Sequence, residues 1–600
     1  MSTIASTREE FFKSKVLGHP AGLFVLFFTE MWERFSFYGM RVLLVNFLTM
    51  AVIGVDNPGW GWSSENAGAL FGTYAGLLYL TPILGGIIAD KITGFRGAVV
   101  LGAIIMTLGH ASMALETEFS LYAGLALLVI GTGFFKPNIT SIISEMYKDL
   151  PEKKDGAYTI FYMGVNAGAF FGMMLCGYLA EKLGWSWGFG LAGIFMLLGT
   201  AQFWLARPLF GDIGAVPVKE EKGTKQADNT AKAAADASGG KRNPFTTIDI
   251  ILIVFSSIVG LLYLINDPVS KIGGVHLLPQ EFILDPEVLP GSMVVTIIGL
   301  IAFLFLAISR IIRYDNVTRD RMFAFIIFAF FTVFFWMSFE QGASSLVLFA
   351  RDFTQRTLEG GAGTTFNIVN ALLTVIPLMI ITWVLGMLFK QTFKKIPVSN
   401  IVLALSFVGV WGIAIWMLVR EFSAESTEIT VSWFSILNSF FIIAFASFFS
   451  KWWESKYNPS AAVKYALGLI IMGIGFGILA FGSRVIPAGA EAGAVRVSMI
   501  WLILAYLFHT LGELCLSPVG LSYVSKLVPA RMIALMFGMW YLAIAIGNKA
   551  AGTIGGMIDE ITAEYSLQTF FLIFTLIPIA AGLLVSALNP LLKKLMHGIR

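Results

Sequence analysis

The chain has few charged residues and almost no cysteine. Asp, Glu, Lys and Arg make up 13% of its 600 residues, whereas soluble domains carry about 25%. Its two cysteines, Cys176 and Cys515, lie far apart within apolar segments, so neither a disulfide framework nor a thiolate metal site is expected. Hydrophobic residues reach 57%, and the mean hydropathy is +0.78. This composition predicts an all-α polytopic membrane protein whose mass lies mostly in the bilayer.

Sequence motifs of catalytic sites are also missing. We find no HExxH or GxSxG pattern and no phosphate-binding loop of the Walker type. The repeated pore-lining pattern that a channel would need is absent as well. A purely structural scaffold would not tolerate the several charges that lie inside predicted spans. We therefore expect neither an enzyme nor a channel, with no catalytic residue, no metal, no cofactor and no nucleic-acid partner.

Apolar stretches that are long enough to cross a bilayer recur along the whole chain. Such a span needs about 20 mostly apolar residues. About sixteen candidates lie near residues 21–50, 66–89, 97–115, 119–144, 157–180, 187–206, 247–266, 292–313, 321–350, 366–389, 399–419, 431–451, 462–482, 497–525, 532–557 and 568–591. A polar stretch at 207–246, rich in Ala, Lys, Asp and Gly, interrupts the series and predicts a flexible cytoplasmic linker.

Basic and acidic residues alternate between successive loops. Every second loop is basic, as in the loop with Lys91 and Arg96, whereas the intervening loops are acidic or neutral, as in the loop with Glu116 and Glu118. The positive-inside rule places the basic loops and both termini in the cytoplasm. The mixed, polar N-terminus does not resemble a cleavable signal peptide. We therefore expect a multi-pass protein of the plasma (inner) membrane.

The spans on either side of the linker predict two helical bundles with a site between them. The N-terminal six-helix bundle takes residues 1–206, and the C-terminal six-helix bundle takes residues 314–600. One inserted helix pair at 247–313 precedes the second bundle, and another at 366–419 interrupts it. Neither pair is expected to bury a charge, so we interpret both as peripheral packing, with a partner-binding surface as the alternative.

The first predicted span carries four charges. In "EMWERFSFYGMR", residues 30–41, the positions of Glu30, Glu33, Arg34, Tyr38 and Arg41 fall within an arc of roughly 140° at 100° per residue. Two acids meet two bases on this face, and Glu30 with Arg34 forms an i,i+4 pair. Because charges in spans face a bundle interior or a wet cavity, we interpret the face as a polar cavity wall. A structural salt-bridge cluster is the alternative.

Further charges lie inside later predicted spans. Lys136 lies in the fourth span, whereas Glu340 and Glu513 lie in the C-terminal half, with Trp336 one turn before Glu340. The N-terminal half thus offers cations and the C-terminal half offers carboxylates. This polarity matches a zwitterion lying across the cavity, its carboxylate towards the cations and its ammonium towards the acids. When the cavity is empty, the same groups can pair with each other as gates.

A buried carboxylate can also couple transport to protons. If it alternates between a paired and an unpaired state, it binds a proton in one state and releases it in the other. Glu340 is the first candidate to carry the proton, followed by Glu30 and Glu33.

Other residues inside spans are weaker signals. The polar side chains of Tyr79, Asn166 and Asn438 suit either hydrogen bonds to a substrate backbone or hydrogen bonds between helices. The spacing of Gly164, Gly168 and Gly172 predicts close helix packing. The lone histidines His110 and His509 are expected in the core. Lys549 lies towards the outer end of its span, where its side chain can snorkel, and the pattern assigns it no function.

Several motifs together resemble one known family. Gly86, Asp90 and Lys91 fit the glycine-x-x-x-aspartate-basic turn of the major facilitator superfamily. "EMWER" at residues 30–34 is similar to the E-x-x-E-R motif on the first helix of the proton-dependent oligopeptide transporters, a branch of that superfamily. Further segments resemble that family in its order, namely "FSFYGMR", "YLTPILGGIIAD", "GTGFFKPN", "FYMGVNAGAF", "FWMSFEQGASSL" and "SILN".

The resemblance implies a major facilitator fold and a symporter that imports di- and tripeptides with protons and works as a monomer. It implies that proton coupling uses Glu30, Glu33, Arg34 and Glu340. It implies a peptide site lined by Arg41, Tyr38, Tyr79, Lys136, Asn166, Trp336, Glu340, Asn438 and Glu513. Salt bridges between the bundles would join Arg41 to Glu340 and Lys136 to Glu513.

Some features depart from the family pattern. Gly72 stands where animal members carry a functional His, so that role is absent or replaced. Phe37 stands where many members have Tyr, which bears on peptide preference, and the helix pair at 366–419 goes beyond the usual pattern. A symporter of the same fold for nitrate or another small organic anion is the alternative function. Against it, the chain keeps both acids of the E-x-x-E-R motif and shows no site histidine.

Overall fold

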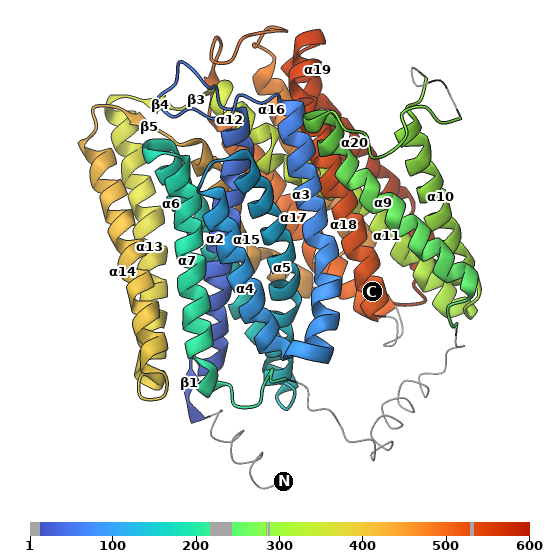
Figure 1. Ribbon diagram of the computed structural model, residues 1–600, viewed down its shortest axis with the longest axis horizontal. Helices are drawn as coiled ribbons and strands as arrows, with labels where there is room; N and C mark the ends of the chain where they lie inside the picture. The colour runs from blue at the N-terminus through green and yellow to red at the C-terminus, as the bar shows by residue number, and fades with distance from the viewer. Residues whose placement is uncertain (1–12, 217–242, 284, 286–287, 528–532, 600) are drawn as a thin grey trace.

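The computed structural model is built almost entirely of long helices that run side by side (Figure 1). It describes residues 13–216, 243–283, 285, 288–527 and 533–599. The first twelve residues and most of the predicted linker, 217–242, lie outside the described residues. We call the end of the molecule at which α2 (Ala21–Thr49) begins the lower end, and the end at which it finishes the upper end, as they lie in Figure 1.

A first group of helices packs together around α2. Helix α2 follows two paired strands of two residues each, β1 (Lys15–Val16) and β2 (His19–Pro20). The other members are α3 (Ser64–Ile88), α4 (Gly94–Met113), α5 (Glu118–Met146), α6 (Lys154–Leu183) and α7 (Trp185–Leu205). A π-helical turn, η1 (Ala89–Thr93), joins α3 to α4, and the short helices η2 (Pro151–Lys153) and η3 (Arg207–Leu209) lie in lower-end loops.

A second group of helices packs together in the C-terminal half. Its members are α11 (Asn316–Phe339), α12 (Ser345–Asp352), α15 (Val431–Glu454), α16 (Ala461–Ser483), α17 (Ile500–Leu527), α18 (Ile533–Gly556), α19 (Ile558–Glu564), α20 (Leu567–Ala587) and α21 (Asn589–Leu595). The single helix predicted at 321–350 is interrupted by a 3₁₀ turn, η4 (Glu340–Ala343). The break falls on a short stretch of polar and small residues, "EQGASS" at 340–345, between two apolar runs. This stretch is too brief to divide the span when apolar residues are counted over about 20 positions.

Two helical hairpins flank the two groups on opposite sides in Figure 1. One consists of α9 (Thr247–Gly273) and α10 (Gly291–Ile312), and the other of α13 (Gly360–Thr392) and α14 (Pro397–Ser423). Short strands tie loops at the upper end, where β3 (Thr354–Gln355) pairs with β6 (Val497–Ser498) and β4 (Thr357–Leu358) pairs with β5 (Thr427–Glu428).

The expectation that the hairpins bury no charge is wrong. Asp249 in α9 is fully buried, and its Oδ2 lies 2.8 Å from Nη1 of both Arg310 and Arg313. Asp249 also closes a capping box with Thr246 at the start of α9. The sequence places all of these residues at helix ends near loops, where charges are usually solvated, and only the tertiary pairing of α9 with α10 brings them together.

The prediction that Lys549 snorkels is also wrong. Its side chain is 5% exposed and forms an ion pair with Asp267 of α9. An acid on a neighbouring helix therefore compensates this charge inside the protein, so the side chain has no need to reach the membrane interface.

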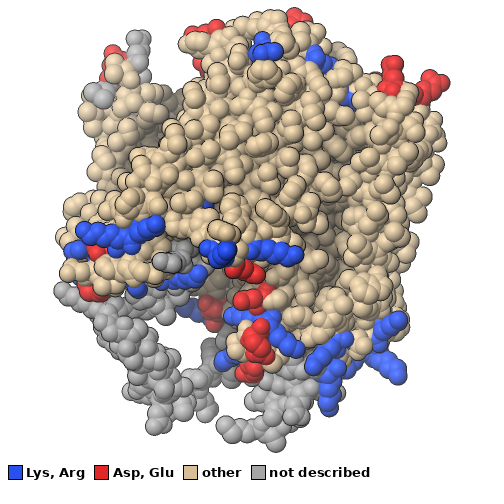
Figure 2. Space-filling view, turned by 180° about the vertical axis from the view of Figure 1, so that it is seen from behind, with Lys and Arg blue, Asp and Glu red and all other residues tan. Residues whose placement is uncertain are grey.

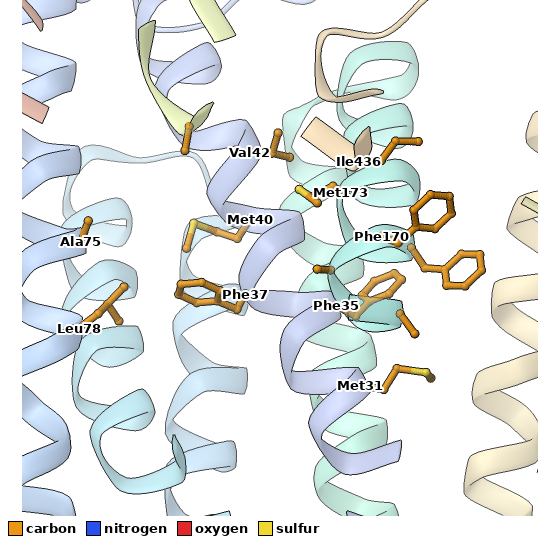
Figure 3. Close-up of a cluster of buried hydrophobic side chains, with 14 of the residues drawn as sticks. Met31, Phe35, Phe37, Met40, Val42, Ala75, Leu78, Phe170, Met173 and Ile436 are labelled. Atoms are coloured by element: carbon orange, nitrogen blue, oxygen red, sulfur yellow. The ribbon is translucent and has the colours of Figure 1, made fainter. Parts of the chain in front are cut away.

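Glycines allow α2 and α6 to approach closely, as predicted from their spacing. A Cβ atom built on Gly168 would lie 2.2 Å from the carbonyl oxygen of Met31, and one on Gly172 would lie 2.2 Å from that of Phe35. Figure 3 shows Met31 and Phe35 in a buried apolar cluster with Phe170 and other side chains. Trp32, on the apolar side of α2, stacks on Phe195 of α7 with a ring separation of 4.9 Å. This packing leaves the charged side of α2 facing the opposite direction.

Twelve helical segments of the described residues are long and apolar enough to cross a membrane. Here α3 and α4 count as one segment, because η1 makes them continuous. The charged helix α2 is not among the twelve. Figure 2 shows a broad band of the surface with almost no Lys, Arg, Asp or Glu, and these side chains gather towards the lower and upper edges of that face. The molecule is a multi-pass membrane protein.

The two groups meet at the upper end through glycines of α3 and α18. A Cβ on Gly552 would lie 2.4 Å from the carbonyl oxygen of Gly68 and 2.4 Å from Cα of Gly72. A Cβ on Gly72 would in turn lie 2.9 Å from the carbonyl oxygen of Lys549. A histidine at this position, as expected for animal relatives, cannot be accommodated in this conformation.

We predict that Gly552→Val weakens the contact between α3 and α18, because the added atoms collide with backbone rather than with a flexible side chain. Overpacking of this kind costs about 1–3 kcal/mol. Thermal unfolding followed by tryptophan fluorescence should show a lower midpoint. Gly386→Val in α13 is the matched control, since a Cβ there meets nothing within 4 Å. Equal midpoints for the two variants would contradict the prediction.

Candidate functional site

A cavity of about 340 Å³ lies between the two groups of helices. Side chains from both groups line it, so relative movement of the groups changes its shape. Ten of the residues predicted from the sequence lie in its wall, namely Arg34, Tyr38, Arg41, Tyr79, Lys136, Asn166, Trp336, Glu340, Asn438 and Glu513. The structure thus brings together residues that are separated by up to several hundred positions. Their roles in transport stay predictions.

Arg41 and Glu340 form an ion pair across the cavity. The side chain of Glu340 is 3% exposed and that of Arg41 is 14% exposed. Glu340 begins the 3₁₀ turn after α11, and this turn positions its carboxylate against α2. The guanidinium of Arg41 also lies 5.8 Å from the ring centres of Tyr38 and Phe71, within the range of a cation–π contact. The predicted pair is therefore present in this conformation.

The second predicted pair, Lys136 with Glu513, is not formed among the described residues. Lys136 Nζ instead lies 4.5 Å from the ring centre of Tyr79. Glu513 Oε2 accepts a hydrogen bond of 2.9 Å from Asn438 Nδ2, which also lies 3.1 Å from Oγ1 of Thr510. Both charged groups remain in the cavity wall, where they can contact a ligand.

Glu30 and Glu33 lie behind the wall and hold Arg34. Nε of Arg34 is 2.7 Å from Oε1 of Glu30 and 2.9 Å from Oε2 of Glu33. Both acids are buried, and within the described part of the chain neither oxygen of Glu33 makes a hydrogen bond. One arginine thus compensates two carboxylates, and only the arginine reaches the cavity.

The sequence argument missed several aromatic and polar residues of the wall. They are Tyr162, Ser435, Tyr506, His509, Trp540 and Tyr541. The expected core position of His509 is correct in part, because this side chain is 3% exposed and packs on Phe476, but it also borders the cavity. Tyr506, His509 and Glu513 share one face of α17 at intervals of three and four residues, and this spacing could have revealed them.

Direct contacts between the groups close the upper end. Glu181 at the end of α6 accepts hydrogen bonds from the backbone N–H groups of Val431 (2.8 Å) and Ser432 (3.1 Å) at the start of α15. Arg351 of α12 donates to Oγ1 of Thr49 over 2.8 Å and contacts Oδ1 of Asn46 over 3.3 Å. Together with the glycine contacts of α3 and α18, these bonds hold the two groups against each other at the upper end.

These features define the class of the protein. Two groups of apolar helices enclose a cavity with cations on one wall and carboxylates on the other, and they touch each other at one end. This is the architecture of a secondary transporter with a binding site between two halves. The molecule is a membrane transporter and not an enzyme.

Comparison with known proteins identifies the family. The profile of the POT family matches residues 96–401 and 413–573, so the chain belongs to the POT family. It is 29% identical over 587 residues to the peptide transporter YePEPT of Yersinia enterocolitica, with 97% of this chain and 96% of that protein covered. It is 28% identical to a di-/tripeptide transporter of Lactococcus lactis, with 100% of both chains covered.

A solved structure supports the same assignment. A crystal structure of a POT peptide transporter in complex with sulfate matches with a TM-score of 0.66 and 28% identity, covering 98% of this chain and 99% of that one. The helical arrangement is therefore of the type seen in POT transporters.

We predict that the double substitution Glu30→Gln and Glu33→Gln destabilises the folded protein. It leaves the buried guanidinium of Arg34 without a compensating charge, and breaking buried ion pairs in this way costs about 3–5 kcal/mol. The thermal unfolding midpoint should fall, and adding Arg34→Met should restore part of the loss.

The control for this prediction is Arg319→Gln. It removes one of the two partners of Asp320, the other being His597, from an ion pair whose arginine side chain is 37% exposed. Exposed pairs contribute only about 0–1 kcal/mol. If the double variant and this control unfold at the same temperature, the three buried charges do not compensate each other.

Proposed function

We propose that the protein is a proton-coupled symporter that imports di- and tripeptides by alternating access. The observation that carries the proposal is the polarity of the cavity. Arg41 and Lys136 lie on the wall formed by the first group, and Glu340 and Glu513 lie on the wall formed by the second. A small peptide carries a carboxylate at one end and an ammonium at the other, so it complements both walls. The names of the relatives from Yersinia and Lactococcus support the same class of substrate.

In this proposal the peptide replaces contacts that the empty cavity makes with itself. Its carboxylate approaches Arg41 and Lys136, and its ammonium approaches Glu340 and Glu513. Tyr38, Tyr79, Asn166 and Asn438 provide hydrogen bonds to the peptide backbone, and Trp336 packs against a peptide side chain. Tyr79 and Trp336 already lie with their ring centres 6.4 Å apart. A cavity of about 340 Å³ lies at the small end of the range of ligand sites.

Proton coupling follows from the ion pair between Arg41 and Glu340. Protonation of Glu340 removes the charge that holds Arg41, which frees this arginine for the peptide carboxylate and loosens the contact between the two halves. Release of the proton restores the pair. Glu30 and Glu33, which share Arg34, form the second candidate site for a proton. Glu340 is our first choice because its ion pair joins the two halves, whereas Glu30 and Glu33 pair with Arg34 of their own helix.

The orientation in the membrane is part of the proposal. We infer about sixteen spans, of which twelve form two six-helix bundles of the major facilitator type, residues 1–206 and 314–600, and four form two inserted pairs. The linker 207–246 is cytoplasmic, and the inserted pairs are 247–313 and 366–419. The lower end carries the basic loops and faces the cytoplasm, with both termini. The contacts that close the upper end then make this an inward-facing conformation of a monomeric transporter in the inner membrane.

A same-fold symporter for nitrate or another small organic anion is the second candidate. The cations of the first wall suit an anion. The two carboxylates on the opposite wall do not, because they would repel it. This arrangement favours a substrate that has an ammonium group as well.

Uptake into proteoliposomes tests the proposal. With an imposed pH gradient, acidic outside, labelled dialanine should accumulate, and an uncoupler should abolish accumulation. Nitrate should neither be taken up nor compete. If a panel of dipeptides produces no peptide-dependent proton movement, the proposed function is wrong.

We predict that Glu340→Gln abolishes proton-driven accumulation but retains exchange of peptide across the membrane without a gradient. Loss of a positioned proton carrier lowers the driven rate by about 100-fold or more, whereas the neutral amide still leaves the cavity open to peptide. Glu491→Gln, in an exposed loop of the upper end, is the control and should behave like the unmodified protein. Full activity of Glu340→Gln in both assays would contradict its role.

A further inference from the structure

A cluster of charges around the buried Lys549 lies outside the cavity, where α3, α9 and α18 meet. Lys549 of α18 forms an ion pair with Asp267 of α9. Its Nζ also donates to Oγ1 of Thr73 over 3.0 Å and to the carbonyl oxygen of Ala69 over 3.3 Å, both on α3. The ammonium therefore bonds to two other helices and is almost completely shielded from solvent.

The same cluster ties α9 to α3. Nζ of Lys271 lies 3.0 Å from Oε1 of Glu65 on α3 and 3.3 Å from Oδ1 of Asp267. Thr73 in turn donates from Oγ1 to the carbonyl oxygen of Leu264 over 2.7 Å. We call Glu65, Asp267, Lys271 and Lys549 the lateral cluster. It contains two acids and two bases, so its formal charge is zero while it is intact.

The position of the lateral cluster links it to the closed upper end. Lys549 lies one turn before Gly552, the residue at which α18 touches the backbone of α3. Lys549 is also the only charged residue in the sequence of α18, Ile533–Gly556. If α18 moves away from α3, while Lys271 and Thr73 hold α9 to α3, only Lys549 is pulled out of the cluster.

Separation of this pair is expensive in the interior of a membrane protein. The ammonium of Lys549, once it leaves the carboxylate of Asp267, must be solvated or must find another partner, and both are unfavourable for a side chain that is 5% exposed. The cost applies only to conformations in which α3 and α18 separate. The lateral cluster therefore favours the closed upper end over an open one.

We propose that Lys549 and Asp267 form a second gate between the two halves, beside the pair Arg41–Glu340, and that the hairpin α9–α10 takes part in gating rather than in packing alone. The first gate lies in the cavity and is accessible to substrate. The second lies outside it, and neither Lys549 nor Asp267 lines the cavity. The first gate thus responds to ligand, whereas the second sets how easily the upper end opens. The proposal rests on alternating access, which belongs to the proposed function.

Distance measurements on the full chain test the gate without any transport assay. Spin labels at Ile53→Cys, in the loop after α2, and at Glu560→Cys, in α19, place one exposed probe on each half of the upper end. The native Cys176 and Cys515 are buried, and a sample without the added cysteines gives the background. In lipid nanodiscs without peptide, the distance distribution reports the ratio of open to closed molecules.

The test compares Lys549→Met and Asp267→Asn with the unmodified protein. Each should raise the ratio of open to closed molecules by at least about tenfold, because the lost ion pair stabilises only the closed form. Asp249→Asn is the matched control. It removes a buried acid from the same helix, but its partners Arg310 and Arg313 belong to the same hairpin, so the ratio should not change.

The double variant Lys549→Met with Asp267→Asn is included because a single variant leaves one charge uncompensated, which can prevent folding. In the double variant neither residue is charged. If a single variant fails to fold, the double variant carries the test, and it too should shift towards the open form. Unchanged distances in the double variant, or an equal shift in Asp249→Asn, would overturn the proposal. Peptide uptake by the unmodified protein is measured separately, so a result that rejects the second gate can be distinguished from a result that rejects the proposed function.

Discussion

Opposite charges of mostly buried side chains on facing walls of the cavity are the constraint on which the rest of the structure depends. Arg41 and Glu340 come from different halves of the molecule, and each needs the other when no ligand is present. Removing either charge leaves the other uncompensated in a medium where that is costly. The same pair therefore joins the two halves when no ligand is present. A ligand with an anion at one end and a cation at the other can replace both partners of this pair.

The surrounding packing couples the exchange of ion-pair partners to movement of the two halves relative to each other. Glycines bring α2 against α6 within one half and α3 against α18 between halves, and backbone contacts of this kind leave no room for gradual adjustment. The halves can therefore either touch or separate at the upper end. Glu181, which caps the first turn of α15 from the other half, is a further contact that exists only in the touching state. Ionic contacts on the cavity wall and beside it bias the same two-state movement.

The residues of the cavity wall could largely be predicted from the sequence, because charges in apolar membrane helices must face the interior of a bundle or a cavity. The face of α2 that carries Arg34, Tyr38 and Arg41 follows from helical periodicity alone, and all three line the cavity. The sequence also indicated which half supplies cations and which supplies acids. Family resemblance was needed to pair Arg41 with Glu340, because periodicity places a residue on a face but does not say which other helix lies opposite.

Other features could not be predicted, for reasons that are physical. The break at Glu340 falls on a short polar stretch, residues 340–345, which is too brief to divide an apolar span counted over about 20 residues. The buried Asp249 and the mostly buried Asp267 lie near the ends of a helix, and from the sequence such residues are expected to be solvated. Their burial depends on basic residues that α10 and α18 bring to them. The Lys136–Glu513 pair was expected but is not formed here, since one sequence must support more than one arrangement of these groups.

Binding of end-blocked dipeptides to the purified protein tests most directly whether both walls are used. Calorimetry would compare dialanine with its N-acetylated form and with its C-terminal amide. If the cations hold the carboxylate and the acids hold the ammonium, each blocked peptide should bind at least about tenfold more weakly than dialanine, because each loses a charge-assisted contact. Equal binding of all three peptides would contradict the account.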